Sequence, residues 1–380
     1  MKLYSILVLT VLTFIIVLEF SVVMPLGPQI ADFYGISRNR VTFLFVGYTS
    51  MGLLSPLFGY LADKYGLKRY LMLSVLFFAI GAFINANATT STVYFIGRSI
   101  LGVGFFTSQS LIITYLSKII AYNKLGIVSG LQKFSFASAM FFAPIVGTFF
   151  INRYSINSLY LSLGIAGSIL LILLFPLQEV KGNKDFDFAD LKRLLMKKEA
   201  VLLMLASLTL SLPSVYFFNY LSVFLQDIGY SVARASWMFS IVAIGSIAAG
   251  VIIIIFSDRF GKLRMSKTGL YISLFALFGF FFRLDPILII AGVMFGVGYD
   301  LIWGLFFPVC SNIYKRGVNT FITLLSMFMS LGGVISSITA PTVMDTFGFS
   351  GNLIVAAVSL AICIVLFTIA TKPYKTTLNR

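Results

Sequence analysis

Long apolar runs separated by short polar turns occupy most of the chain. Each run is close to the ~20 residues that an α-helix needs to cross a bilayer, where every backbone polar group must be satisfied within its own segment. We therefore predict an all-α polytopic membrane protein with twelve transmembrane helices. The predicted spans lie near residues 4–26, 41–61, 70–88, 92–116, 124–150, 157–176, 200–225, 235–256, 268–284, 286–312, 317–344 and 350–371.

The one long polar stretch divides these spans into six and six. A mixed-sign charge run of this kind is typical of a solvated segment. We expect three parts: a six-helix bundle at residues 1–177, a cytoplasmic linker at 178–199 and a second six-helix bundle at 200–380.

A charged turn recurs at a constant distance along the chain. Asp63 and Gly66 follow the second span, and Asp258 and Gly261 follow the eighth. Asp258 lies 195 residues after Asp63, and Gly261 lies 195 residues after Gly66. The two turns also contain the candidate residues Gly59, Lys64, Lys68, Arg69 and Arg259. Two pseudo-symmetric six-helix halves are a known transporter design, with the substrate site between the halves at the bilayer midplane.

Composition agrees with a membrane protein. Hydrophobic residues make up 59% of the chain and charged residues 11%, against about 25% charged in soluble domains. The net charge is +15, and the Lys and Arg residues of the short loops gather on one side of the predicted membrane. Such loops stay in the cytoplasm, so both termini and the linker are expected there, in a multi-pass protein of the cell membrane. Topology and anionic lipid explain the basic excess without a nucleic-acid partner.

The sequence lacks the residues that metal binding and nucleotide chemistry require. The chain has no histidine and only two cysteines, Cys310 and Cys363, far apart, so we expect no metal site. The Gly-x-Gly pairs lie inside apolar runs and not in a strand-to-helix turn, which excludes a dinucleotide loop. We expect no cofactor, no ATP-driven step and no enzyme activity. Any proton chemistry falls to carboxylates.

Four ionisable side chains lie inside predicted spans, where they are costly and therefore functional candidates. They are Glu19, Arg98, Lys133 and Asp300, in spans 1, 4, 5 and 10. Because burial penalises the charged form of a carboxyl group, Glu19 is the first candidate for a proton carrier and Asp300 the second. The alternative for Glu19 is a structural pair with Arg98. Arg98 would hold an anionic substrate or tune Glu19, the alternative being a static salt bridge.

Other polar side chains are candidates for the substrate cavity. Lys133 lies about 15 Å into its span at 1.5 Å per residue, and would pair with an acid or contact substrate. Gln109 shares the Arg98 face of span 4. The other candidates are Tyr216, Asn219 and Tyr220 in span 7 and Trp303 in span 10. For the tyrosines, an interfacial anchor is the alternative.

The motifs in these spans and turns resemble those of the major facilitator superfamily over the whole chain. The turn at 59–69 resembles its signature loop, and Arg98-x3-Gly102-x-Gly104 resembles the span 4 motif of proton-coupled members. The first span carries an acid, Glu19, six residues before Pro25. In this it resembles the first span of the sugar-efflux and multidrug-efflux proton antiporter branch. The antiporter motif of span 5 is degraded around Pro144, with Ala139 and Ala143 at glycine positions.

The resemblance implies that spans 1, 4, 7 and 10 line a central cavity. It also implies that the turn at 59–69 is a conformational gate, in which Asp63 and the neighbouring cations hold span 2 against span 11. The alternative is that these cations only fix topology. Leu67 replaces a commonly basic position of the gate.

The resulting interpretation is a secondary transporter working by alternating access. We expect proton-coupled export of a small organic molecule, drug-like or sugar-like, by a monomer in the lipid bilayer. The alternative is proton-coupled or passive uptake of an organic anion or sugar. A channel or a non-transporting receptor is the remaining hypothesis, and the repeat and the buried charges speak against a simple receptor.

Overall fold

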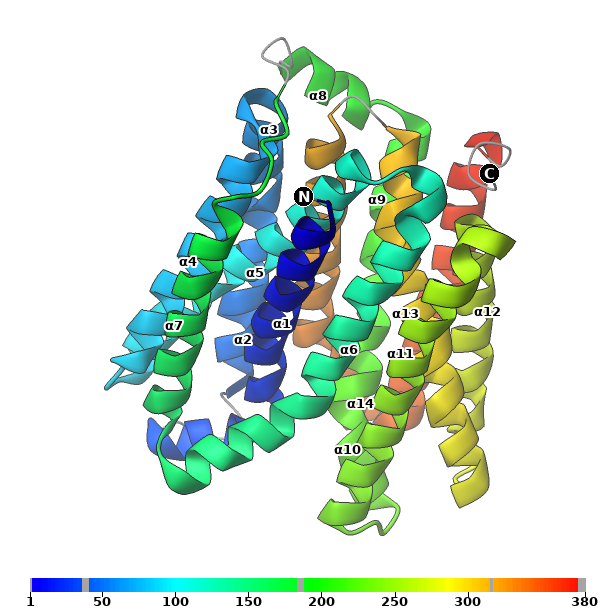
Figure 1. The fold of residues 1–380 in the computed structure, drawn as a ribbon. Helices are drawn as coiled ribbons and strands as arrows, with labels where there is room; N and C mark the ends of the chain where they lie inside the picture. The colour runs from blue at the N-terminus through cyan, green and yellow to red at the C-terminus, as the bar shows by residue number, and fades with distance from the viewer. Residues whose placement is uncertain (1, 36–40, 183–187, 315–316, 375–380) are drawn as a thin grey trace. The chain divides into compact units, whose positions relative to one another are not determined.

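A computed structural model describes residues 2–35, 41–182, 188–314 and 317–374 (Figure 1). Part of the predicted linker, residues 183–187, lies outside the described residues. The side chains of Pro25 and Pro144, which belong to the predicted motifs, also lie outside them.

Every regular element in the described part of the chain is a helix, so the predicted all-α fold is confirmed. Nine of the described helices are long and apolar enough to cross a membrane. The helices are α1 (Lys2–Phe33), α2 (Val41–Ser50), η2 (Met51–Leu54), α3 (Ser55–Tyr65), α4 (Leu67–Ala86), α5 (Ser91–Ile119), α6 (Tyr122–Arg153), α7 (Ile156–Leu174), α8 (Phe188–Leu195), α9 (Lys198–Pro213), η3 (Ser214–Phe218), α10 (Asn219–Asp227), α11 (Val232–Phe260), α12 (Lys262–Gly279), α13 (Asp285–Ile313), α14 (Val318–Thr371) and η4 (Lys372–Tyr374).

Four predicted spans differ from single regular helices. Span 2 consists of α2, the 3₁₀ turn η2 and α3. Span 7 consists of α9, which ends at Pro213, the π-helical turn η3 and α10. Proline lacks the N–H of a regular helical bond, and π turns take up the resulting register change. Spans 11 and 12 are joined in α14, where Gly348 has a non-helical φ of 64°.

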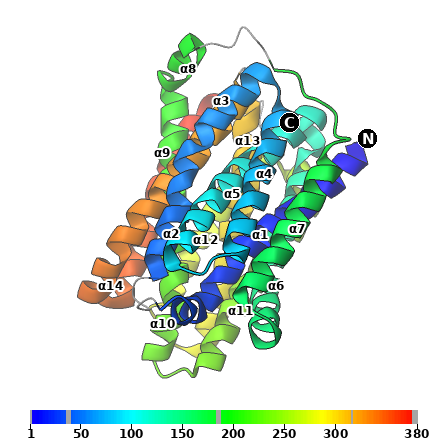
Figure 2. The same cartoon turned by 90° about the vertical axis from the view of Figure 1, so that its left-hand side faces the viewer.

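The chain divides into two compact units. Unit 1 comprises Met1–Ile120, Ser138–Leu191 and Arg316–Ser330. Within it, α4 packs along α5 and α7, and α1 and α2 also contact α5 (Figure 2). These helices bury the residues considered below.

Unit 2 comprises Ala121–Ala137, Lys192–Lys315 and Leu331–Arg380. Its central helix is α13, which packs against both α11 and α12. An apolar cluster at this junction includes Ile253, Met265 and Leu305.

The units differ from the predicted halves in two segments. Residues 121–137, the start of α6, belong to unit 2, although they lie in the first predicted bundle. Residues 316–330, around the start of α14, belong to unit 1, although they lie in the second. Each unit therefore contains contacts between the two sequence halves, and acidic side chains account for several of them.

Candidate functional site

Two of the four predicted charges form an ion pair inside unit 1. Glu19 of α1 and Arg98 of α5 are both fully buried. The Arg98 guanidinium donates to Glu19 Oε1, and the Tyr48 hydroxyl of α2 donates to Oε2 over 3.1 Å. Buried charges are tolerated only with such partners, because desolvation costs several kcal/mol per ion. The structural pair with Arg98, which was the alternative to a proton carrier for Glu19, is therefore present. Within this pair Glu19 is a carboxylate that a proton can neutralise.

Tyrosines surround this ion pair. The Tyr48 ring centroid lies 4.1 Å from Arg98 Cζ, a cation–π contact. Tyr94, one turn before Arg98 on α5, shares a 2.7 Å hydroxyl hydrogen bond with Tyr160 of α7. Sequence analysis did not select these three residues; the available signal was a tyrosine hydroxyl inside each predicted span.

Gly102 makes the Tyr48 contact possible. A Cβ atom at Gly102 would lie 3.0 Å from Tyr48 Cα and still closer to its carbonyl group. The span 4 glycine therefore allows α2 to approach α5 closely enough for Tyr48 to reach Glu19 and Arg98.

The other two predicted charges form a second ion pair, in unit 2. Lys133 of α6 lies 2.5 Å from Asp300 Oδ1 of α13. The Lys133 ammonium also lies 4.3 Å from the ring centroid of Phe136 on its own helix. Both charged residues are almost fully buried. The expectation that Lys133 pairs with an acid is realised in this geometry.

The remaining cavity candidates are distributed over both units. Gln109 lies in unit 1, and its Nε2 atom is buried without a hydrogen-bond partner among the described residues. Tyr216 in unit 2 is buried and shares a 2.6 Å hydroxyl hydrogen bond with Thr339. Asn219 is exposed and Tyr220 half-buried. Trp303, also in unit 2, packs its ring 6.0 Å from that of Tyr299.

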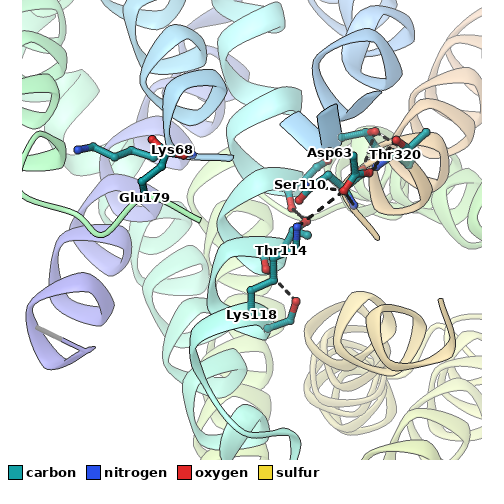
Figure 3. Close-up of polar contacts among 10 residues, drawn as sticks. Asp63, Lys68, Ser110, Thr114, Lys118, Glu179 and Thr320 are labelled. Carbon is teal, nitrogen blue, oxygen red and sulfur yellow. Dashed lines mark hydrogen bonds and ion pairs between the residues drawn. The ribbon is translucent and has the colours of Figure 1, made fainter. Parts of the chain in front are cut away.

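Asp63 binds the start of α14 within unit 1 (Figure 3). Its carboxylate accepts hydrogen bonds from Asn319 N and Nδ2 at 3.3 and 2.8 Å, and from Thr320 N and Oγ1 at 2.7 and 2.8 Å. The first backbone amides of a helix have no partner within the helix and carry partial positive charge, so a carboxylate is well placed there. A Cβ atom at Gly59 would lie 2.7 Å from Asn319 O, so this glycine allows α3 to approach α14.

A cation from another helix completes the Asp63 environment. Lys118 Nζ of α5 lies 3.7 Å from Asp63 Oδ1. Burial raises the pKa of the Asp63 carboxyl, whereas Lys118 and the hydrogen bonds from Thr320 and Asn319 act in the opposite direction.

The cations of the turn itself make other contacts. Lys68 donates from Nζ to Phe175 O over 2.6 Å, and its backbone N–H donates to Glu179 (Figure 3). Lys64 lies over the rings of Tyr60 and Tyr65, and Arg69 is exposed. Among the described residues, none of these cations links span 2 to span 11 by a hydrogen bond or an ion pair. The cation that lies beside Asp63 is Lys118 of α5.

The cognate turn in unit 2 repeats the arrangement. Asp258 accepts hydrogen bonds from the backbone N–H groups of Gly126 and Ile127 near the start of α6, each at 3.1 Å. Lys262 also donates to Asp258. Gly261 has φ +88°, a conformation that favours glycine, and Arg259 is exposed. In both turns a carboxylate therefore binds backbone amides of a helix from the other sequence half.

Comparison with known families and proteins gives a consistent result. The sequence profile of the Major Facilitator Superfamily matches residues 9–317 and, in a second alignment, residues 203–380. Azole resistance protein 1 of Saccharomyces cerevisiae is 28% identical over 173 residues, 45% of this chain. The chain matches only 28% of that protein's length.

Two further comparisons cover more of the chain. The putative metabolite transport protein YwtG of Bacillus subtilis is 25% identical over 346 residues, 77% of this chain and 74% of its own length. The structure of the E. coli fucose:proton symporter FucP covers 97% of this chain and 99% of its own, with a TM-score of 0.79 at 13% identity. At that identity the likeness establishes the fold alone.

Proposed function

Because this chain belongs to the Major Facilitator Superfamily, we propose that it exports a small organic molecule in exchange for protons. It is a multi-pass membrane protein and a secondary transporter, not an enzyme. The observation that carries the finer proposal is the fully buried Glu19, held between Arg98 and Tyr48.

Glu19 is suited to proton exchange because its main partner cannot take part. The Arg98 guanidinium stays protonated at all working pH values, so only the carboxylate of the pair titrates. Protonation of Glu19 changes the pair from neutral to net positive in a fully buried site. A conformation that exposes this pair to water is then favoured, which links proton binding to the conformational equilibrium.

The two acidic turns are suited to act as gates. Asp63 and Asp258 each bind amides near the start of a helix from the opposite six-span half. If the halves rock around a central site, these contacts form on closure and break on opening. We place them on the cytoplasmic side, together with both termini, from the distribution of Lys and Arg.

Two kinds of support favour export over uptake. The name of the yeast relative links that protein to azole resistance, and a Mycobacterium tuberculosis relative is named a multidrug resistance protein B homolog. The alternative of organic-anion uptake needs a cation available to the substrate. Arg98 and Lys133 each already hold a carboxylate, which weighs against it.

The test is transport in proteoliposomes with an imposed pH gradient. An azole, an organic ammonium compound and a hexose serve as substrates, and an entrapped pH dye reports proton movement. We expect substrate-linked proton flux in the wild type and its loss in Glu19→Gln, which mimics the protonated carboxyl. Asp227→Asn, which removes an exposed carboxylate at the end of α10, is the matched control and should keep wild-type flux.

Three results would contradict the proposal. Full gradient-driven flux in Glu19→Gln would remove Glu19 as the proton carrier. Substrate flux that is indifferent to the gradient would favour facilitated diffusion, and a continuous ion current under voltage clamp would favour a channel.

A further inference from the structure

The Lys133–Asp300 ion pair connects two helices from opposite repeats. Lys133 lies on α6, in the first six-span half, and Asp300 on α13, in the second, yet both belong to unit 2. A Cβ atom at Gly304 would lie 3.3 Å from Lys133 Cβ, so the two helix backbones approach closely beside the pair. If the sequence halves rock with their boundary between α6 and α13, this motion separates the two charges.

The two partners differ in what remains to each after separation. Lys133 keeps the ring of Phe136, which lies three residues further along its own helix and moves with it. Asp300 has no hydrogen bond and no second ion pair among the described residues. A buried carboxylate without a partner is strongly unfavourable, so Asp300 must gain another cation or a proton whenever Lys133 leaves.

The surroundings of the Lys133 ammonium are those of a site for an organic cation. A carboxylate oxygen lies 2.5 Å from Nζ and an aromatic ring centroid lies 4.3 Å from it. A carboxylate combined with the face of an aromatic ring is the chemistry that recognises ammonium ligands. An anionic ligand would meet Asp300 and the negative face of Phe136, and a neutral sugar would find no complementary charge.

We propose that Lys133 is a built-in competitor in a binding site for organic ammonium compounds formed by Asp300 and Phe136. The ammonium group of the ligand displaces Lys133 from Asp300 and supplies the cation that Asp300 needs when α6 and α13 separate. This deepens the proposed function by naming cationic amines as the exported class. Substrate binding then lowers the cost of the conformational change, because the ligand stays with Asp300 while Lys133 retains Phe136.

The test is equilibrium binding to the purified full-length protein, without membrane or gradient. The probe is benzyltrimethylammonium, measured by calorimetry at pH 8. If Lys133 occupies the site in about 90% of molecules, its neutralisation raises the apparent affinity about tenfold. We expect this gain in Lys133→Met and in Lys133→Gln, which keeps a hydrogen-bond donor toward Asp300 should the methionine variant fold poorly.

Matched variants separate this effect from non-specific binding. Lys133→Arg keeps the competing cation and should bind like the wild type. When Lys133→Met is combined with Asp300→Asn or with Phe136→Leu, the roughly tenfold rise in benzyltrimethylammonium affinity should disappear. Phenylacetate, of similar size and opposite charge, should bind none of these variants more tightly.

Two outcomes would overturn the inference. One is an unchanged benzyltrimethylammonium affinity in the folded Lys133→Met and Lys133→Gln proteins. The other is tighter phenylacetate binding in Asp300→Asn, which would make Lys133 the ligand-binding group and the substrate an anion. Neither readout depends on protons or transport, so failure here is distinguishable from failure of proton-coupled export.

Discussion

Replacing Asp63 with asparagine should open the contact between α3 and α14. The carboxylate accepts two hydrogen bonds on each oxygen, all between 2.7 and 3.3 Å. Asparagine keeps one acceptor oxygen and places an amide NH₂ group against two donors. It therefore loses two hydrogen bonds, the attraction of Lys118 and the charge interaction with the start of α14.

The magnitude follows from these losses. Hydrogen bonds to charged groups contribute ~1.5–3 kcal/mol each and are not additive, and a charge at a helix N-terminus contributes about 0.3–1 kcal/mol. Truncating one partner of a buried charged contact costs about 2–5 kcal/mol in total. We take about 3 kcal/mol, which is roughly a hundredfold increase in the population of the open contact.

A buried serine provides the assay. Ser55 is fully buried and donates to Gly52 O and to Thr323 O of α14. In a background without Cys310 and Cys363, Ser55→Cys reacts with maleimide only when α3 and α14 separate. The labelling rate then tracks the open fraction, and we expect Asp63→Asn to raise it roughly a hundredfold without a comparable change in substrate affinity.

The control is Glu179→Gln, which removes a carboxylate that contacts Lys68 in the same turn but not α14. Its labelling rate should stay near that of the parent protein. An unchanged labelling rate in Asp63→Asn, or a large loss of substrate affinity with normal labelling, would refute the gate.

Three further changes test the same reasoning elsewhere. Tyr48→Phe removes a hydrogen bond to the Glu19 carboxylate but keeps the ring, so the pH profile of transport should shift relative to the wild type; an unshifted profile would separate Tyr48 from Glu19. Gly102→Ala forces a Cβ against the Tyr48 backbone and should destabilise the protein by ~1–3 kcal/mol, seen as a lower melting temperature in detergent. Asp258→Asn should open the second gate less than Asp63→Asn opens the first, because Asp258 is only half-buried; maleimide labelling of Ser257→Cys, whose parent side chain is buried, measures it.

The sequence singled out four charges inside the spans and named a Glu19–Arg98 pair as one alternative, but it did not identify the acid that pairs with Lys133. The cost of a charge inside a span singles out Glu19, Arg98, Lys133 and Asp300 without structural information. Their partners depend on which helix faces meet, and Glu19 and Arg98 are 79 residues apart. Spans 1 and 4 were expected to share a cavity, whereas the contact of α6 with α13 depends on packing that no local pattern encodes.

The residues that were missed share a physical reason. Tyr48, Lys118 and Thr320 each contact a buried carboxylate through a single polar group. Tyrosine and threonine are common in membrane helices, so their type alone does not mark them. Lys118 lies at the end of a span, where cations are common and serve topology. Nothing local distinguishes it from Lys68, which lies in the signature-like turn; the Lys68 ammonium donates to Phe175 O instead, and its backbone N–H donates to Glu179.

The two ion pairs respond differently to the proposed rocking motion. Glu19 and Arg98 lie on helices of the same six-span half, so rotation of one half against the other leaves their contact intact. That pair can change state only by gaining a proton, which requires access to water. Lys133 and Asp300 lie in opposite sequence halves although both belong to unit 2, so if the proposed rotation follows the boundary between the sequence halves, it breaks their contact whether or not a proton is present. A transporter with both pairs can therefore exchange a proton at the first and a cationic substrate at the second. Its coupling depends on the helices that connect them, and not on competition for a single carboxylate.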